Sequence, residues 1–142
     1  MIKYKALFFL KTVFLCMYSG LAQLQVSDEN GEKMMIRIAA LEIYPEYLED
    51  YNSILKKEAE SSVRLEEGVI CIYPMFQKEN PTQIRLLEIY ADSAAYRSHL
   101  KTPHFLEYKT STLKMVKSLK LIDMEAIDKK ATAKIFKKMY AD

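Results

Sequence analysis

The sequence of 142 residues contains no tryptophan and only two cysteines, two histidines and three glycines. So few cysteines exclude the disulfide framework of a small secreted scaffold. No group of cysteines and histidines has the spacing of zinc ligands, so we expect no metal. The sequence also lacks an uninterrupted run of about 20 apolar residues, the length of a membrane-spanning helix. Half of the residues are hydrophobic, which favours one ordinary globular domain with one core.

The first 22 residues have the pattern of a secretory signal peptide. Two lysines precede an apolar run at 6–18, and small residues stand at positions 20 and 22 before a cleavage site at Gln23. An uncleaved anchor is the alternative. A lipoprotein signal at Cys16 is disfavoured because Leu15 stands where a small residue is needed. We therefore expect an exported protein, periplasmic or secreted.

After removal of residues 1–22, the mature chain is nearly neutral and keeps one cysteine, Cys71. The three lysines of the removed segment have no acidic counterpart there, so the formal net charge falls from +2 to −1. Nucleic-acid-binding proteins usually show a clustered basic face, and we expect no nucleic-acid partner. Cys71 lies in the apolar run VICIYPMF and fits a small buried hydrophobe, with an intermolecular disulfide as the alternative.

Alternating strand and helix patterns follow a polar, flexible leader at 23–33. A glycine at the end of the first helix and Asp92 before the second mark helix boundaries. Pro74 indicates an edge strand or a bulge, because proline cannot donate to a strand ladder. We expect strands at 34–43, 69–77, 82–90 and 118–124, a helix at 45–64, and a second helical region from 93 to 117 that Pro103 interrupts.

This order, β-α-β-β-α-β, predicts an α+β protein of the ferredoxin-like class. Its four-stranded antiparallel sheet carries both helices on one face. The other face also carries apolar side chains and must be buried. A homodimer that packs sheet to sheet is the simplest solution.

The last segment, 125–142, has the pattern of a basic amphipathic helix. We expect this tail to pack on its own dimer. Contact with a membrane surface is the less favoured alternative.

Residues 66–108 carry a pattern that resembles the antibiotic biosynthesis monooxygenase family, whose members are small dimeric α+β barrel proteins. An acid–glycine pair precedes a strand, a turn follows, the next strand ends in glutamate and an aromatic residue, and two histidines lie in the helices beyond. The residues that carry this pattern are Glu67-Gly68, Asn80-Pro81, Glu88, Tyr90, His99 and His104-Phe105. The resemblance extends over 34–124 and implies the fold that the strand and helix patterns predict.

The resemblance also implies an activity. The family includes quinol monooxygenases and enzymes that oxidise polyketide anthrones to quinones, generally without metal, flavin or haem. A deprotonated hydroquinone or anthrone is electron-rich enough to donate an electron to oxygen itself. The protein has to bind the ring, remove a proton and stabilise the anion. We therefore expect a monooxygenase that oxidises a small phenolic or quinol-type compound with O2 and uses no cofactor.

The candidate catalytic residues are His99 and His104, because an imidazole can serve as a base or as a donor. Tyrosines offer hydroxyl groups and ring surfaces to an aromatic ligand, and arginines stabilise anionic oxygens. The candidate substrate-binding residues are Tyr73, Glu88, Tyr90, Tyr108, Arg37 and Arg85, with Tyr96 as a further tyrosine. Structural roles are the alternative, because the histidines flank a helix break and need not share a face, and tyrosines often serve in cores and interfaces.

Two other functions stay open. One is a non-catalytic dimer that binds a small apolar aromatic ligand or haem. Haem-degrading relatives use an asparagine, a tryptophan and a histidine ligand, but here His99 aligns with the tryptophan and Lys109 with the histidine, and the first strand has no asparagine. These departures argue against haem degradation. The other function is a structural dimer whose tail contacts a membrane or a partner.

Overall fold

The structure is a computed structural model that describes residues 34–128 and residue 134. The predicted signal peptide and leader, and nearly all of the predicted C-terminal helix, lie outside the described residues. The elements are β1 (Met35–Ile43), the short 3-10 helix η1 (Pro45–Tyr47), α1 (Leu48–Leu65), β2 (Val69–Gln77), β3 (Asn80–Tyr90), α2 (Ser93–His99), α3 (Pro103–Thr112) and β4 (Val116–Met124). None of the described helices is long and apolar enough to cross a membrane.

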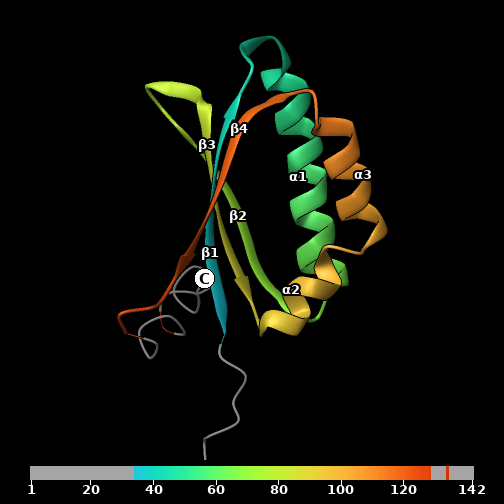
Figure 1. Ribbon diagram of the computed structural model, residues 1–142, viewed down its shortest axis with the longest axis vertical. Helices are drawn as coiled ribbons and strands as arrows, with labels where there is room; N and C mark the ends of the chain where they lie inside the picture. The colour runs from blue at the N-terminus through green and yellow to red at the C-terminus, as the bar shows by residue number, and fades with distance from the viewer. Residues whose placement is uncertain (1–33, 129–133, 135–142) are drawn as a thin grey trace, which may run out of the picture. The chain divides into compact units, whose positions relative to one another are not determined.

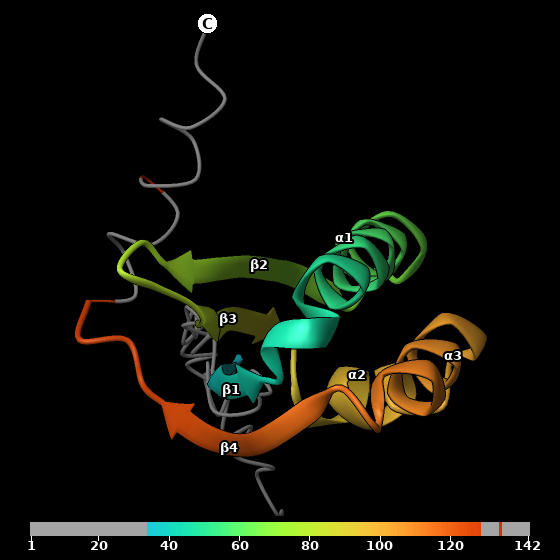
Figure 2. The same cartoon turned by 90° about the horizontal axis from the view of Figure 1, so that it is seen from above.

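The four strands form one antiparallel sheet in the order β2-β3-β1-β4. All the helices lie on one face of this sheet, as Figures 1 and 2 show from two directions. The predicted ferredoxin-like α+β fold is confirmed. β2 is an edge strand, as Pro74 predicted, so its missing N–H costs the sheet little.

Several boundaries differ from the prediction. β3 begins at Asn80 instead of residue 82, and the first helical region is divided into η1 and α1. The second helical region ends at Thr112 instead of Lys117, and the last strand begins at Val116 instead of Ser118. Tertiary contacts decide this difference. Met115 is buried, its carbonyl accepts a hydrogen bond from the backbone of Tyr44 at 3.0 Å, and Val116 already pairs with β1. Strand pairing therefore ends a helical pattern that would continue by local preference alone.

Local signals set the break between α2 and α3. The side chain of Asp92 caps α2 and that of Thr102 caps α3, each by accepting a hydrogen bond from a backbone N–H. Pro103 occupies the first turn of α3, where its missing N–H is not needed. The break places His99 at the end of one helix and His104 at the start of the next.

Gly68 lets α2 pack closely on the start of β2. A Cβ atom at this position would lie 2.5 Å from the Cβ of Ala95, inside van der Waals contact. The glycine is therefore required by space. It holds α2 against the sheet and so positions the residues at the end of that helix.

Candidate functional site

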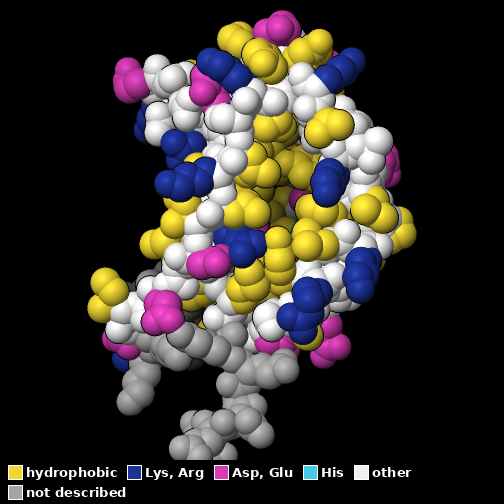
Figure 3. Space-filling view, in the orientation of Figure 1, with side chains coloured by type: hydrophobic (Ala, Val, Ile, Leu, Met, Phe, Trp, Pro, Cys, Tyr) yellow, Lys and Arg dark blue, Asp and Glu magenta, His cyan; other side chains and the backbone are white. Residues whose placement is uncertain are grey.

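A cavity of about 500 Å³ lies between the sheet and the helices. Figure 3 shows it as a hollow lined largely by hydrophobic side chains. Its sheet side is apolar, with Ala39, Leu41 and Leu86 among the lining residues. The helix side is aromatic and polar, with Tyr96, His99, Phe105 and Tyr108. This size and lining suit a small ligand with an aromatic ring.

Exposed leucines and lysines line the outer part of the cavity. Leu113 is 74% exposed, and Leu119 and Leu121 of β4 are about half exposed. Lys109 and Lys117 complete this rim. A ligand that enters the cavity would therefore pass an apolar rim with two lysines beside it.

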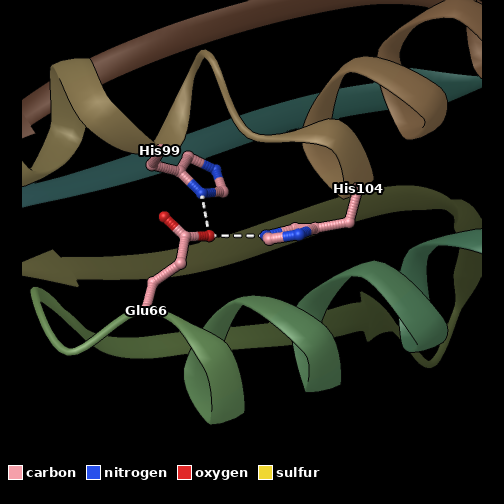
Figure 4. A group of neighbouring side chains, drawn as sticks. All are labelled: Glu66, His99 and His104. Carbon is pink, nitrogen blue, oxygen red and sulfur yellow. Dashed lines mark hydrogen bonds and ion pairs between the residues drawn. The ribbon is translucent and has the colours of Figure 1, made fainter.

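The two histidines meet at one carboxylate. Nδ1 of His99 lies 2.9 Å from Oε1 of Glu66, and Nε2 of His104 lies 2.6 Å from the same oxygen. Figure 4 shows the two rings converging on this oxygen from α2 and α3. Glu66 is the residue that caps the end of α1, so the cluster ties three helices together. The five-residue separation across Pro103 therefore does bring both rings to one point.

Only His99 also lines the cavity. Its side chain is 3% exposed, and its ring packs against Phe105 with 4.7 Å between centroids and against Tyr90 with 5.6 Å. Nε2, the nitrogen that does not face Glu66, lies 3.8 Å from Oε1 of Glu58. His99 is thus held between two carboxyl groups. His104 faces a small crevice between α1 and α3 instead.

Two carboxyl groups lie in the cavity wall, the buried Glu58 from α1 and the partly buried Glu88 from β3. Burial raises the pKa of Glu58, while a 2.7 Å hydrogen bond from Ser62 and the nearby histidines oppose this shift. Burial likewise raises the pKa of Glu88, whose Oε2 accepts a 3.2 Å hydrogen bond from the hydroxyl of Tyr90. A carboxyl group with a raised pKa keeps its proton more readily and can then donate to a ligand oxygen.

Tyr90 and Tyr108 of the cavity wall remain protonated at neutral pH. Burial raises the pKa of Tyr108 to about 12, and its hydroxyl lies 2.7 Å from that of Tyr51. Burial and the neighbouring Glu88 raise the pKa of Tyr90 as well. These groups can orient a ligand by hydrogen bonds, but they are poor bases.

Arg37 lies on the helix face of the sheet, opposite Glu88 in the strand register, but its charge is already engaged. Its Nε and Nη2 donate to Oδ1 of Asp123 at 2.8 and 2.6 Å, and its guanidinium stacks 4.6 Å from the centre of the Tyr96 ring. Arg37 therefore supports the cavity wall through Tyr96.

Tyr73 and Arg85 lie on the other face of the sheet. They alternate with residues of β2 and β3 that face the helices, and the register pairs Tyr73 with Leu87. Arg85 donates to the carbonyl oxygen of Ile84 at 2.7 Å. The structure thus brings together His99, Glu88, Tyr90 and Tyr108 in the cavity, places His104 and Arg37 beside it, and separates Tyr73 and Arg85 from it.

The sequence analysis did not identify Glu58 or Glu66. Glu58 had a signal that could have been read: it lies between Leu55 and Ser62 at helical spacing, on the buried stripe of α1. A charged residue in such a stripe needs a partner in the core. Glu66 had no comparable signal, because it ends the helix among other charged residues.

The fold and the site define a ferredoxin-like protein with a buried histidine at the wall of an apolar cavity. The family model described as antibiotic biosynthesis monooxygenase matches residues 34–111. The chain belongs to this family, which confirms the resemblance seen in the sequence.

Solved structures agree with the assignment. A protein from Bacteroides thetaiotaomicron VPI-5482, provisionally named an antibiotic biosynthesis monooxygenase, is 50% identical with a TM-score of 0.67, over 68% of this chain and 91% of that one. A Lactobacillus acidophilus NCFM protein, provisionally named a monooxygenase, is 30% identical with a TM-score of 0.65, over 66% of this chain but only 45% of its own. A Nitrosomonas europaea protein at 18% identity, with a TM-score of 0.64 over 68% of this chain and 92% of that one, shows the shared fold alone. No curated protein matches the sequence.

Proposed function

We propose that the protein oxidises a small phenolic or quinol-type compound with O2 in the cavity between sheet and helices, without a bound cofactor. The observation that carries this proposal is the placement of His99. Its imidazole stands in the wall of an apolar, aromatic-lined cavity and is oriented by the 2.9 Å contact of Nδ1 with Glu66. Cofactor independence follows from the family resemblance.

Glu66 prepares His99 as a base. A carboxylate at Nδ1 favours the tautomer that carries its proton there, which leaves a lone pair on Nε2. Nε2 can accept a proton from a phenol in the cavity, and the imidazolium that forms is stabilised by Glu66. His104 contacts the same oxygen of Glu66 from outside the cavity. We assign His104 a positioning role, in which it holds that oxygen in place.

The rest of the cavity fits the anion that deprotonation creates. Protonated Glu88 or the hydroxyl of Tyr108 can donate to a developing phenolate oxygen. The deprotonated ring then transfers electrons to O2. One oxygen atom enters the ring, the other leaves as water, and a hydroquinone becomes a hydroxyquinone. The apolar lining excludes competing water and favours a neutral ring over an ionised carboxylate, whose removal from water would be costly.

Oxygen consumption tests this proposal. The purified protein, treated with a chelator, is assayed against hydroquinones, anthrones and catechols, with His99→Ala and His104→Ala alongside. Because a general base contributes about 100- to 10,000-fold, His99→Ala should lose at least about 100-fold in kcat. His104→Ala is the matched control and should lose much less. Absence of uptake above autoxidation for every compound, or an equal loss in both variants, would contradict the proposal.

A non-catalytic binding module is the second candidate. The apolar lining of the cavity favours it, because such a lining holds an aromatic ligand whether or not a reaction follows. The same panel separates the two functions. Saturable quenching of tyrosine fluorescence by a hydroquinone or by haem, without oxygen uptake, would identify a binder.

A further inference from the structure

We propose that Glu66, His99 and His104 form a binding site for a divalent transition-metal ion of the Zn²⁺ type, at the junction of α1, α2 and α3. The proposal is independent of the oxidation proposed above. It rests on the convergence of three ligand-type side chains from separate helix ends, which Figure 4 shows.

The distances suit one ion. One ligand atom from each of the three residues lies within 4.8 Å of the other two. In the metal-free arrangement the carboxylate oxygen is 2.9 and 2.6 Å from the two ring nitrogens, which are hydrogen-bond distances. A tetrahedral ion with bonds of about 2.0–2.1 Å separates its ligands by about 3.3 Å. Accommodating the ion therefore needs the carboxylate oxygen to move away from both ring nitrogens and the two nitrogens to lie about 3.3 Å apart, which side-chain rotation can supply.

The donor set selects the metal. Two imidazole nitrogens and one carboxylate oxygen suit Zn²⁺, Co²⁺ or Ni²⁺, whereas Mg²⁺ and Ca²⁺ prefer oxygen ligands alone. Three protein ligands leave a fourth position for water or a small ligand. The side chains of Glu66 and His104 are 12% and 19% exposed, so an ion can enter from their side, while His99 closes the inner side at 3%.

Neighbouring groups can hold the ligands in place. When Nδ1 of His99 binds the ion, its proton moves to Nε2, which lies 3.8 Å from Oε1 of Glu58. After a small shift, Glu58 can accept a hydrogen bond from Nε2–H. The hydroxyl of Ser62 already donates a 2.7 Å hydrogen bond to Glu58 and holds this carboxyl group in place. A metal-bound histidine whose second nitrogen faces a carboxylate is a frequent arrangement in metalloproteins.

The spacing of residues along the chain concealed this group. The sequence analysis expected no metal because it found no cluster of cysteines and histidines, and it considered no glutamate. Glu66 is 33 positions before His99, and only the fold places them in contact. Without an ion, the carboxylate of Glu66 can accept hydrogen bonds from both imidazoles, so these buried polar groups keep a partner. The metal-free protein is therefore not destabilised.

Calorimetric titration of the tag-free, chelator-treated full chain with Zn²⁺ tests the proposal, and Co²⁺ absorption reports the ligand geometry. We expect one ion per chain, a rise in Tm, and no response to Mg²⁺. Glu66→Gln and His104→Ala should each weaken Zn²⁺ binding by more than about 100-fold, the upper range for loss of a mere supporting partner. Glu67→Gln, an exposed neighbour, is the matched control and should bind as the unchanged protein does.

Circular dichroism confirms that each variant is folded before binding is compared. Glu66→Gln keeps the size and hydrogen-bonding capacity of the side chain, so its fold should persist even if His104→Ala is less stable. Absence of Zn²⁺ binding at micromolar concentration would overturn the proposal. Unchanged binding in folded Glu66→Gln would overturn it equally, because the ion would then lie elsewhere.

Discussion

Oε1 of Glu66 and Nε2 of His104 lie 2.6 Å apart, although 38 positions separate the residues in the sequence. The same oxygen contacts His99, so one side chain at the end of α1 organises both histidines of the chain. The proposed catalysis and the proposed metal site both depend on Glu66. In catalysis its carboxylate orients His99, whereas in the metal site it would bind the ion.

Glu66→Gln should lower the oxidation rate. The amide removes the negative charge that stabilises a protonated His99, and either end of the amide can face Nδ1, so the tautomer is no longer fixed. We expect a loss of kcat of about tenfold or more, smaller than the loss of about 100-fold expected for removal of the base itself, with little change in KM. Steady-state oxygen uptake measures both values. Glu67→Gln should leave them unchanged, and an equal effect of that control would refute the role of Glu66.

Zn²⁺ should inhibit the oxidation. Coordination of Nδ1 of His99 moves the proton to Nε2 and removes the lone pair that accepts the substrate proton. Oxygen uptake at increasing Zn²⁺ should fall in parallel with occupancy measured by calorimetry, and a chelator should restore it. Zn²⁺ that binds without inhibiting would leave the metal site intact and contradict the role of Nε2 as base.

Gly68→Ala should destabilise the fold. Its new Cβ would lie 2.5 Å from that of Ala95, and overpacking of this kind costs about 1–3 kcal/mol. Urea denaturation measures the change in the free energy of unfolding. Ala95→Gly removes the Cβ atom with which the new Cβ would clash. The double variant should therefore be more stable than the sum of the two single changes predicts. Simple additivity would show that the clash is relieved elsewhere.

Glu88→Gln should alter how stability depends on pH. Burial raises the pKa of Glu88 above its ordinary value of 4.5. The folded state therefore holds this proton at pH values where the unfolded chain has lost it, and stability falls as pH rises from about 4.5 through the raised pKa. Glutamine still accepts from Tyr90 but does not ionise. Thermal unfolding across pH 4–8 should show a smaller decline in stability for the variant. An identical decline would show that ionisation of Glu88 does not destabilise the folded state.

The protein should be a homodimer through the open sheet face. The strand register aligns Tyr73, Leu87, Ile38 and Ile122 in one apolar row across all four strands of the sheet, on the side without helices. Tyr73→Asp should shift the protein to monomer in sedimentation velocity at micromolar concentration. Leu106→Asp, an exposed change on α3, is the control and should remain dimeric. A monomer in the unchanged protein would show that this face is covered in another way.

Several elements could be predicted from the sequence because local physics determines them. Alternation defined the strands, Pro74 indicated an edge, and Asp92 and Pro103 marked the helix boundaries that separate α2 from α3. Boundaries that depend on partners were wrong: β4 begins at Val116 because it pairs with β1 there, and helical periodicity continued past that point.

The family pattern identified the residues of the site better than it could identify their arrangement. His99, Glu88, Tyr90 and Tyr108 are in the cavity, but Tyr73 and Arg85 are on the opposite face, because the direction of each side chain depends on strand register and bulges. A bulge near Cys71 shifts that register in β2, which no spacing rule could reveal.

The order of the elements, the ferredoxin-like fold and the family could be predicted because they depend on periodicity, caps and motifs that lie close together along the chain. The tertiary structure alone decided that His99 and His104 share Glu66 and that His99 reaches the cavity. Packing of three helix ends brings residues 66, 99 and 104 together. Contacts between such distant positions form only when the chain folds, and they depend on the close approach that Gly68 allows.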